Sequence, residues 1–573
     1  MGKSLTKGSF CLLLIAFAMA GCQPRVTPAD LVLRNGRLYT VDGAMPWAAA
    51  AAVRNGRFVY VGDDAGAARY IGGATRVIDL GGRLALPGFI DSHAHPISSY
   101  KHFFEIDLSG CRGGDDCQRK VAAYAKAHPE APFIRGRGWS NTDFPKTGPD
   151  KRLLDAVVPD RPAALASEDG HSKWVNSRAL ALAGVTRATR DPAGGVIERD
   201  PRSGEPTGTL REAAADLVAG LFPAPGLEEL KQGLEAYQDM ALACGITTVH
   251  DASLDAESSD TQAYRELEGT GRLRLRVRAS LYVDPQKGTA QLAALEHERV
   301  RNAGRLFQTR AAKLFADGVV EGSTAYLLEP YRHLPGSRGE PVWSADALDR
   351  MCVELDRRLW QIHIHAIGDA AVRSCLDALA AARQANGRRD ARHLLTHLQL
   401  VEAGDVARFA PLGVIAVVQP FWFSKDAYYR DIQVPYLGQE RADREYPMAG
   451  FLRAGVKAAS SSDFPVTVPC DPLRGIQTGV TRTEIGSTGP DEVLWPEERA
   501  DLEQMIASFT IHGAFANFLE DVTGSIAAGK SADLIVLDKD LFRIPVAEIS
   551  TAKVLMTLFE GNVVFGGISG SRR

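Results

Sequence analysis

The sequence predicts an α/β protein: a (β/α)8 TIM-like barrel, a small β-sandwich domain built from both chain ends, and an insertion after the first barrel strand. The central region alternates apolar runs with helical stretches, which is typical of a parallel α/β architecture. β-rich segments flank that region at both ends of the chain. A long stretch rich in Gly, Pro, Asp and Arg interrupts the alternation early, which favours an excursion from the barrel.

Length and composition agree with this picture. The chain has 573 residues, more than one hydrophobic core ordinarily serves, so we expect more than one domain. Hydrophobic residues make up 45% and charged residues 24%, as in ordinary soluble globular proteins. The formal net charge is -4, and there is no basic stripe or acidic tail. The charge pattern therefore predicts no nucleic-acid partner.

The first 21 residues have the features of a signal peptide. Lys3 and Lys7 precede an apolar run over residues 10–20 that is too short to span a bilayer comfortably. The run ends in Met-Ala-Gly-Cys22, which resembles a bacterial lipoprotein signal with cleavage before Cys22 and lipidation of that residue. The alternative is secretion without a lipid. In both cases we expect an exported protein of the cell envelope, with residues 22–29 as a tether and no other contact with the membrane.

Short β-rich segments occupy both ends of the remaining chain. Asn35-Gly36 and Asn55-Gly56 each lie between two β-rich runs, and this dipeptide is the strongest short-range signal for a hairpin turn. Further β-rich runs follow near the C-terminus. The economical interpretation is one β-domain made of residues 30–85 and 520–567, with the barrel, residues 86–519, inserted between them.

Ten apolar runs of the central region have the character of strands. They end near His95, Trp139, Ser167, Asp251, Tyr282, Lys313, His365, His397, Gln419 and Asp463. A barrel needs eight strands, so we assign the runs that end at Trp139 and Ser167 to the insertion, over residues of about 100–235. The active site is then expected at the C-terminal ends of the eight barrel strands.

Those strand ends carry side chains that bind metals. In an extended strand alternate side chains share a face, so His93 and His95 point the same way. His363 and His365 repeat this spacing, and neutral imidazole is a ligand for zinc and its first-row neighbours. The remaining polar residues at strand ends are Lys313, His397 and Asp463. Several such residues at successive strand ends predict a metal site.

The motifs that hold these residues resemble the amidohydrolase superfamily, in the branch of the N-substituted formamide deformylase-like proteins (amidohydrolase family 3). They are Pro-Gly-Phe-Ile-Asp-Ser-His-Ala-His95, Lys313-Leu-Phe-Ala-Asp-Gly, His365-Ala-Ile-Gly-Asp and Ser-Asp463-Phe-Pro, in the family order. The resemblance extends from about residue 30 to 565. It implies a metal-dependent hydrolase that cleaves a C–N bond of a small amide or N-substituted formamide.

The resemblance also implies a role for each residue. His93 and His95, with Asp463, would hold one divalent metal, and His365 and His397 would hold a second. Lys313 would bridge two zinc ions as a carbamate, because an ammonium group has no lone pair whereas a carbamate supplies an anionic oxygen. Manganese, iron or cobalt could replace zinc. Asp463 would act as general base and then general acid for a metal-activated hydroxide.

Some of these assignments have a competing explanation. Lys313 could form an ion pair with Asp317, since a buried ammonium is otherwise costly. His363 could replace His365 as a ligand, although His365 lies closer to the end of its strand. Asp317 and Asp369 are then expected to structure loops.

The insertion contributes three further predictions. Trp139, and His171 within Asp-Gly-His-Ser-Lys-Trp, resemble family positions near the substrate, so we expect them to contact it; the alternative is that they brace the insertion. Cys111 and Cys117 enclose a polar loop, and in an oxidising compartment we predict a disulfide between them, with two free thiols as the alternative.

Two other functions compete with amide hydrolysis. The first is a metal-dependent deaminase or cyclic-amide hydrolase of the same superfamily. Deaminases of this kind would use one metal and lack the bridging lysine, so Lys313 favours amide hydrolysis. An exported binding protein that had lost its chemistry would have a damaged set of ligands, whereas the set here is complete.

Overall fold

The computed structural model describes residues 26–167, 171–192, 195–256, 258–487 and 489–568. The predicted signal peptide and Cys22 lie outside these residues. Among the helices in the described part of the chain, none combines the length and apolar character needed to cross a membrane.

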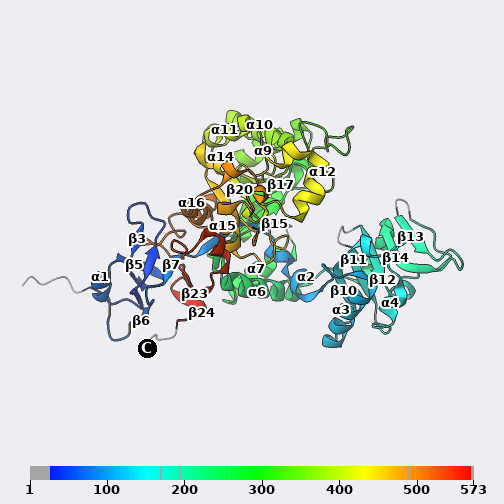
Figure 1. Cartoon of the computed structure of the whole chain (residues 1–573), viewed down its shortest axis with the longest axis horizontal. Coiled ribbons are helices and arrows are strands. Elements are labelled where there is room, and N and C mark those ends of the chain that lie inside the picture. The colour runs from blue at the N-terminus through cyan, green and yellow to red at the C-terminus, as the bar shows by residue number, and fades with distance from the viewer. Residues whose placement is uncertain (1–25, 168–170, 193–194, 257, 488, 569–573) are drawn as a thin grey trace, which may run out of the picture.

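A barrel of eight parallel strands forms the centre of the molecule (Figure 1). In chain order the strands are β8 (Phe89–Ala94), β15 (Ile246–Leu254), β16 (Arg276–Tyr282), β17 (Phe307–Phe315), β18 (Gln361–Ala366), β19 (Leu394–His397), β20 (Ile415–Val418) and β21 (Ala458–Ser460). Each pairs in parallel with the next. The predicted (β/α)8 architecture is therefore confirmed.

Backbone hydrogen bonds close the barrel between its first and last strands. The N–H of His95 donates to the carbonyl of Phe464 at 2.7 Å, and the N–H of Asp463 donates to the carbonyl of His93 at 2.9 Å. The chain just after β21 thus lies against the end of β8. This seam places Asp463 beside the His-x-His pair.

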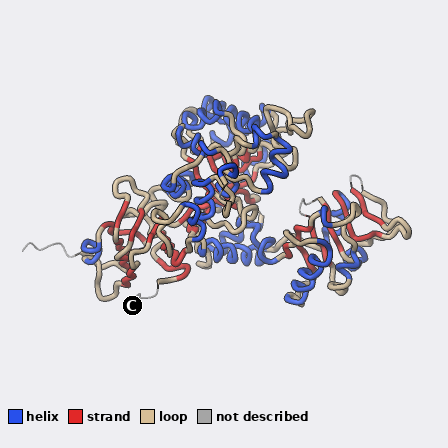
Figure 2. The backbone as a smooth tube through the Cα atoms, viewed as in Figure 1, coloured by secondary structure: helices blue, strands red, loops and turns tan. Residues whose placement is uncertain are grey.

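Helices surround the strands on the outside of the barrel (Figure 2). The main ones are α6 (Leu227–Ala243), α7 (Ser259–Gly269), α8 (Leu292–Arg301), α9 (Ala345–Arg357), α10 (Asp369–Asn386), α11 (Ala403–Leu412), α14 (Met448–Arg453) and α15 (Pro472–Thr481). α9 shows why they pack there: it buries Leu348, Met351, Cys352 and Leu355, spaced as one face of a helix. Burial of each leucine is worth about 1.5–3 kcal/mol.

Two sheets lie at the opposite end of the molecule from the insertion (Figure 1), and the larger one contains strands from both ends of the chain. One has the order β5-β4-β1-β6, and the other has the order β24-β23-β22-β7-β2-β3. Their strands are β1 (Leu31–Arg34), β2 (Arg37–Tyr39), β3 (Trp47–Ala48), β4 (Ala50–Arg54), β5 (Arg57–Gly62), β6 (Arg76–Asp79), β7 (Leu84–Pro87), β22 (Leu534–Leu537), β23 (Val554–Phe559) and β24 (Asn562–Gly566). β7 pairs antiparallel with β22, Leu86 opposite Ile535.

The two Asn-Gly pairs have different outcomes. Asn55 and Gly56 have φ values of 50° and 73° and join β4 to β5 as a hairpin, as the primed turn types require. At Asn35-Gly36 the chain instead passes from one sheet to the other, because β1 pairs with β4 and β6 while β2 pairs with β3 and β7.

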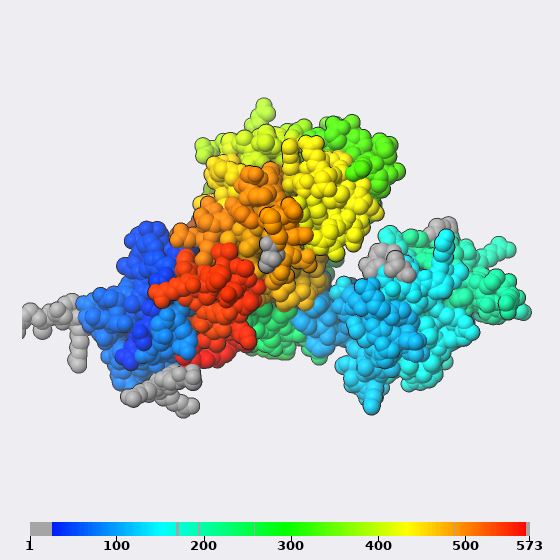
Figure 3. All heavy atoms as spheres, in the orientation of Figure 1, coloured from blue at the N-terminus to red at the C-terminus, as the bar shows by residue number. Residues whose placement is uncertain are grey.

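The insertion contains its own sheet, of order β13-β14-β12-β11-β10-β9. Its strands are β9 (Ile106–Asp107), β10 (Ile134–Trp139), β11 (Ala163–Ser167), β12 (Ser172–Val175), β13 (Gly195–Arg199) and β14 (Pro206–Glu212), with helix α3 (Gly113–Ala127) packed beside them. The two surplus strands therefore belong to the insertion, as predicted. Figures 1 and 3 show it as a separate lobe joined to the barrel near α2 (Ser99–Phe104) and α6.

The predicted disulfide between Cys111 and Cys117 is absent, and both residues are buried free thiols. The segment between them is not an exposed loop, because α3 begins at Gly113 and carries Cys117 into the core of the insertion. Burial, with the neighbouring Cys111, raises the pKa of Cys117 to about 12. The reactive thiolate form is thereby disfavoured.

A buried ion pair ties the barrel to the β-domain. Arg276, at the start of β16, lies 2.9 Å from Asp533, which precedes β22, and both side chains are almost fully buried. Asp533 also accepts hydrogen bonds from Thr523 and Ser531. Arg276 and the two hydroxyl groups therefore stabilise the buried negative charge of Asp533.

We expect Arg276→Ala to lower the free energy of unfolding by about 3–5 kcal/mol, because it leaves Asp533 buried and uncompensated. Urea denaturation followed by tryptophan fluorescence measures the loss. The matched control is Arg305→Ala, whose guanidinium is 67% exposed in its pair with Glu560 and should be worth less than about 1 kcal/mol. Equal losses in the two variants would contradict the assignment.

Candidate metal centre

The C-terminal ends of the barrel strands surround a cavity of about 430 Å³. All six side chains predicted as ligands line it: His93, His95, Lys313, His365, His397 and Asp463. They come from β8, β17, β18, β19 and the segment after β21. Alternation along each strand and the closing seam of the barrel account for their meeting in one place.

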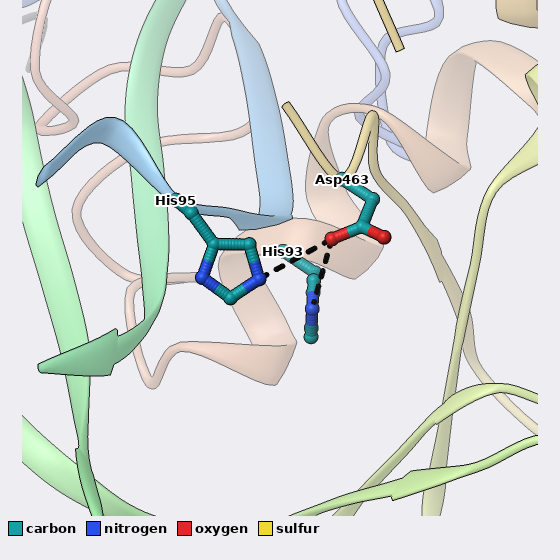
Figure 4. Close-up of side chains that lie close together, drawn as sticks. All are labelled: His93, His95 and Asp463. Atoms are coloured by element: carbon teal, nitrogen blue, oxygen red, sulfur yellow. Dashed lines mark ion pairs between the residues drawn. The ribbon is translucent and has the colours of Figure 1, made fainter. Parts of the chain in front are cut away.

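His93, His95 and Asp463 form the tightest group (Figure 4). Oδ1 of Asp463 lies 3.3 Å from Nε2 of His93 and 3.3 Å from Nε2 of His95. Burial lowers the pKa of His93 well below its ordinary value, so this ring is neutral. Burial alone would raise the pKa of Asp463, but the hydrogen bond from His95 and nearby positive charges outweigh it and lower the pKa. Neutral imidazole beside a carboxylate is a donor set for a divalent cation.

Lys313 lies inside the barrel and lines the cavity. Its side chain is fully buried, and Nζ has no hydrogen-bond partner among the described residues. Burial lowers its pKa to about 7, although Asp463 acts in the opposite direction. An amine with this pKa is largely neutral just above pH 7 and has a free lone pair.

The alternative ion pair of Lys313 with Asp317 is not found among the described residues. The carboxylate of Asp317 instead accepts backbone N–H bonds from Tyr326 at 2.8 Å, Ile367 at 3.0 Å and Gly368 at 2.9 Å. Asp317 therefore joins the loops after β17 and β18 and forms no ion pair with Lys313.

His365 and His397 each present one free ring nitrogen. Nε2 of His365 lies 3.1 Å from the carbonyl of Gly318 and must donate to it, which leaves Nδ1 with the lone pair. Nδ1 of His397 lies 3.0 Å from Oε1 of Gln419. The amide Nε2 of Gln419 donates to Oγ of Ser461, so Oε1 faces His397 and accepts its proton. The lone pair of His397 is therefore on Nε2. Gln419 ends the seventh predicted strand, and only its polarity there could have indicated this role.

His363, the alternative to His365, lies deeper in the barrel. It is fully buried and does not line the cavity. Its Nε2 lies 2.9 Å from Nδ1 of His93, and its Nδ1 lies 3.0 Å from Oγ of Ser280. His363 therefore contacts the predicted ligand His93 but does not itself reach the cavity.

Trp139 and His171 are not brought to the cavity, so their predicted contact with the substrate has to be corrected. Trp139 is fully buried in the insertion, where its indole N–H donates to the carbonyl of Leu165 at 2.8 Å. His171 lies on the surface of the insertion, 3.2 Å from Glu212. Both residues brace the insertion, because the family-like stretches belong to its sheet and not to a barrel loop.

Loops supply the outer wall of the cavity. Aromatic residues line much of it, namely Phe315, Trp422, Tyr428 and Tyr446, together with Val319, Ile367 and Val466. Two carboxylates, Glu321 and Asp426, also face it. Within the Phe421-Trp-Phe423 stretch that follows β20, Trp422 lines the cavity while Phe423 is buried.

Residues 76–565 match the profile of a family described as "Amidohydrolase family". The chain belongs to this family. It is 32% identical over 544 residues to Protein LONG AFTER FAR-RED 3 of Arabidopsis thaliana, covering 94% of this chain and 92% of that protein. It is 27% identical to the N-substituted formamide deformylase of Arthrobacter pascens, with coverage of 93% and 97%.

A solved structure agrees with this assignment. An uncharacterized metal-dependent hydrolase from Pyrococcus furiosus superposes with a TM-score of 0.72 at 27% identity, covering 89% of this chain and 99% of that one. The amidohydrolase resemblance and the enzyme class predicted from the sequence, a metal-dependent amidohydrolase, are therefore confirmed.

Proposed function

We propose that this protein hydrolyses the C–N bond of a small amide or N-substituted formamide at a centre of two divalent metal ions. The observation that carries the proposal is the fully buried, unpartnered Nζ of Lys313 in a cavity lined by four histidines and Asp463. An ammonium group buried there without a hydrogen bond is costly, even with Asp463 in the same cavity. The similarity to a formamide deformylase supports the choice of bond.

The ligands divide into two groups on this proposal. His93, His95 and Asp463 would hold one ion, His365 and His397 the other, and Lys313 would bridge them. Addition of carbon dioxide forms a bond from Nζ to carbon and releases one proton from the nitrogen. The product is an anionic oxygen donor, and the pKa of about 7 for Lys313 makes the neutral amine that reacts abundant near neutral pH.

The chain's own groups would move the protons. When bound, zinc or a similar ion would polarise the substrate carbonyl and lower the pKa of a water molecule. Asp463, which its neighbours hold as a carboxylate, would accept a proton from the attacking water and pass it to the leaving nitrogen. The buried rings around it would exclude other water.

The walls of the cavity favour neutral or positively charged substrates over negatively charged ones. Lys313 is the only lysine or arginine among the described lining residues, whereas Glu321 and Asp426 are acidic. Burial and a hydrogen bond to Glu321 raise the pKa of Tyr428, so the tyrosine donates to this carboxylate. We propose that the nitrogen substituent is aromatic or apolar and carries a neutral or positive group, and that a carboxylate there is repelled.

We propose in addition that the protein is exported and anchored in the bacterial cell envelope by a lipid on Cys22. The basic residues Lys3 and Lys7, the apolar run over residues 10–20 and the position of Cys22 support this.

The metal proposal predicts the composition of the centre. We expect about two metal ions per chain in the protein from residue 23 onward, and fewer in Lys313→Ala, because the bridging donor is lost. Elemental analysis, with and without added bicarbonate, measures this. Asp463→Asn should retain its fold and lose turnover. One ion per chain in both the parent and Lys313→Ala would favour the one-metal deaminase instead.

The substrate proposal predicts an order of rates among three N-formyl phenethylamines with a para-aminomethyl, para-methyl or para-carboxyl group. We expect kcat/KM of the carboxyl compound to be about tenfold lower than that of the cationic one, the equivalent of about 1.4 kcal/mol. Glu321→Gln should reduce this ratio. Glu340→Gln, an exposed change elsewhere on the chain, should not. A ratio that Glu321→Gln leaves unchanged would refute the charge selection.

The export proposal predicts where the full-length chain is found in a bacterial host. The parent should fractionate with membranes, and Cys22→Ser should appear in the soluble periplasmic fraction, because it lacks the lipid-bearing thiol. Immunoblots of the fractions measure both. Cytoplasmic location of the parent would show the proposal to be wrong.

A further inference from the structure

We infer that a chain of hydrogen bonds from Asn517 to His93 fixes the tautomer of His93 and thereby makes its Nε2 a metal ligand. The chain consists of Asn517, His250, Ser280, His363 and His93. All five side chains are buried. The inference rests on the proposed metal centre for its functional meaning, whereas the hydrogen bonds stand on the geometry alone.

The links of this chain are short and continuous. Oδ1 of Asn517 lies 2.7 Å from Nδ1 of His250, and Nε2 of His250 lies 2.7 Å from Oγ of Ser280. That oxygen lies 3.0 Å from Nδ1 of His363, whose Nε2 lies 2.9 Å from Nδ1 of His93. β18 and β8 are not neighbours in the barrel, so the last link crosses its interior.

The direction of the chain is set at Asn517, which follows helix α17 (Ile511–Ala516). Its Nδ2 donates to the carbonyl of Gly513 at 2.9 Å, so Oδ1 must face His250. The opposite amide orientation would place two oxygens against each other at Gly513. Asn517 lies near the N-terminal end of β18, because Gln361 at the start of that strand donates to the carbonyl of Ala516 at 2.8 Å.

Each following group has one proton to give, so the direction propagates. Oδ1 of Asn517 can only accept, and His250 therefore carries its proton on Nδ1 and accepts at Nε2. Ser280 donates its single hydroxyl proton there, and its oxygen accepts from Nδ1–H of His363. The Nε2 of His363 is then an acceptor, and His93 must donate to it from Nδ1.

The outcome is a lone pair on Nε2 of His93. This atom lies 3.3 Å from Oδ1 of Asp463 and has no hydrogen-bond partner among the described residues. With the opposite direction of the chain, Nε2 would carry a proton and bond to the carboxylate. That arrangement would satisfy both groups and occupy the position of the metal. The remote Asn517 therefore acts as a positioning residue for a ligand that it does not touch.

Metal affinity measured by chelator competition tests the inference. Ser280→Ala removes the middle link, and we expect it to weaken binding about 10–100-fold, the usual effect of losing a partner of a metal-bound histidine. Asn517→Leu should weaken it similarly, because the side chain then offers no acceptor to Nδ1 of His250. Ser508→Ala is the matched control. It also removes a buried hydroxyl, but that hydroxyl is bonded to Ser460 and takes no part in the hydrogen bonds between Asn517 and His93.

The double variant distinguishes a chain from separate structural contributions. If Asn517 acts through Ser280, Ser280→Ala with Asn517→Leu binds metal no more weakly than Ser280→Ala alone. Independent contributions would multiply the losses, and this result would overturn the inference.

The tautomer itself is measured on metal-free protein labelled with 15N-histidine, by long-range 1H–15N correlation. We expect the His93 proton on Nδ1 in the parent, with a growing Nε2–H population in Ser280→Ala. A His93 proton on Nε2 in the parent would overturn the inference. Failure of the parent to bind any metal would instead refute the proposed function and leave this measurement intact.

Discussion

The seam between the first and last barrel strands is the constraint on which the site depends. Two backbone hydrogen bonds join His93 and His95 to Asp463 and Phe464. Asp91 strengthens this junction by accepting from the hydroxyl and the N–H of Ser462. Without the seam the carboxylate of Asp463 would have no fixed relation to the imidazoles, although every ligand would still be present in the sequence.

Around that seam, hydrogen bonds from buried polar groups orient the histidine rings. Three of the imidazoles have one ring nitrogen bonded to the protein: His365 to Gly318, His397 to Gln419 and His93 to His363. In each of these three rings the other nitrogen is left with the lone pair. Lys313 differs from them, because its amine has no hydrogen-bond partner in the described part of the chain.

The parts of this arrangement that could be predicted are those with a local periodic signature. Alternation along an extended strand placed His93 with His95, and strand ends located Lys313, His397 and Asp463. The alternation of apolar runs with helical stretches likewise indicated the barrel. The role of His363 was not settled by spacing, since it shares a face with His365, and depth in the barrel decides between them.

What could not be predicted depends on contacts between distant segments. Asn517 gives no sign in its own neighbourhood that it meets His250, because the two are joined only by the closure of the barrel. Trp139 and His171 were misplaced for the same reason: the sequence showed their motifs, but the packing of the insertion's own sheet decided where they face. Cys111 and Cys117 were misjudged because a polar stretch proved to start a helix.

The antiparallel pairing of β7 with β22 has a consequence for how the chain is made. Strand β7 is synthesised well before its neighbour β22, because the insertion and the whole barrel lie between them in the sequence. One edge of β7 therefore stays unpaired while those segments are made, and such edges invite association with other chains. Contacts this distant in sequence also form slowly. A rearranged chain in which β22 and β7 were close in sequence would bring these partners together soon after their synthesis and shorten that exposed interval.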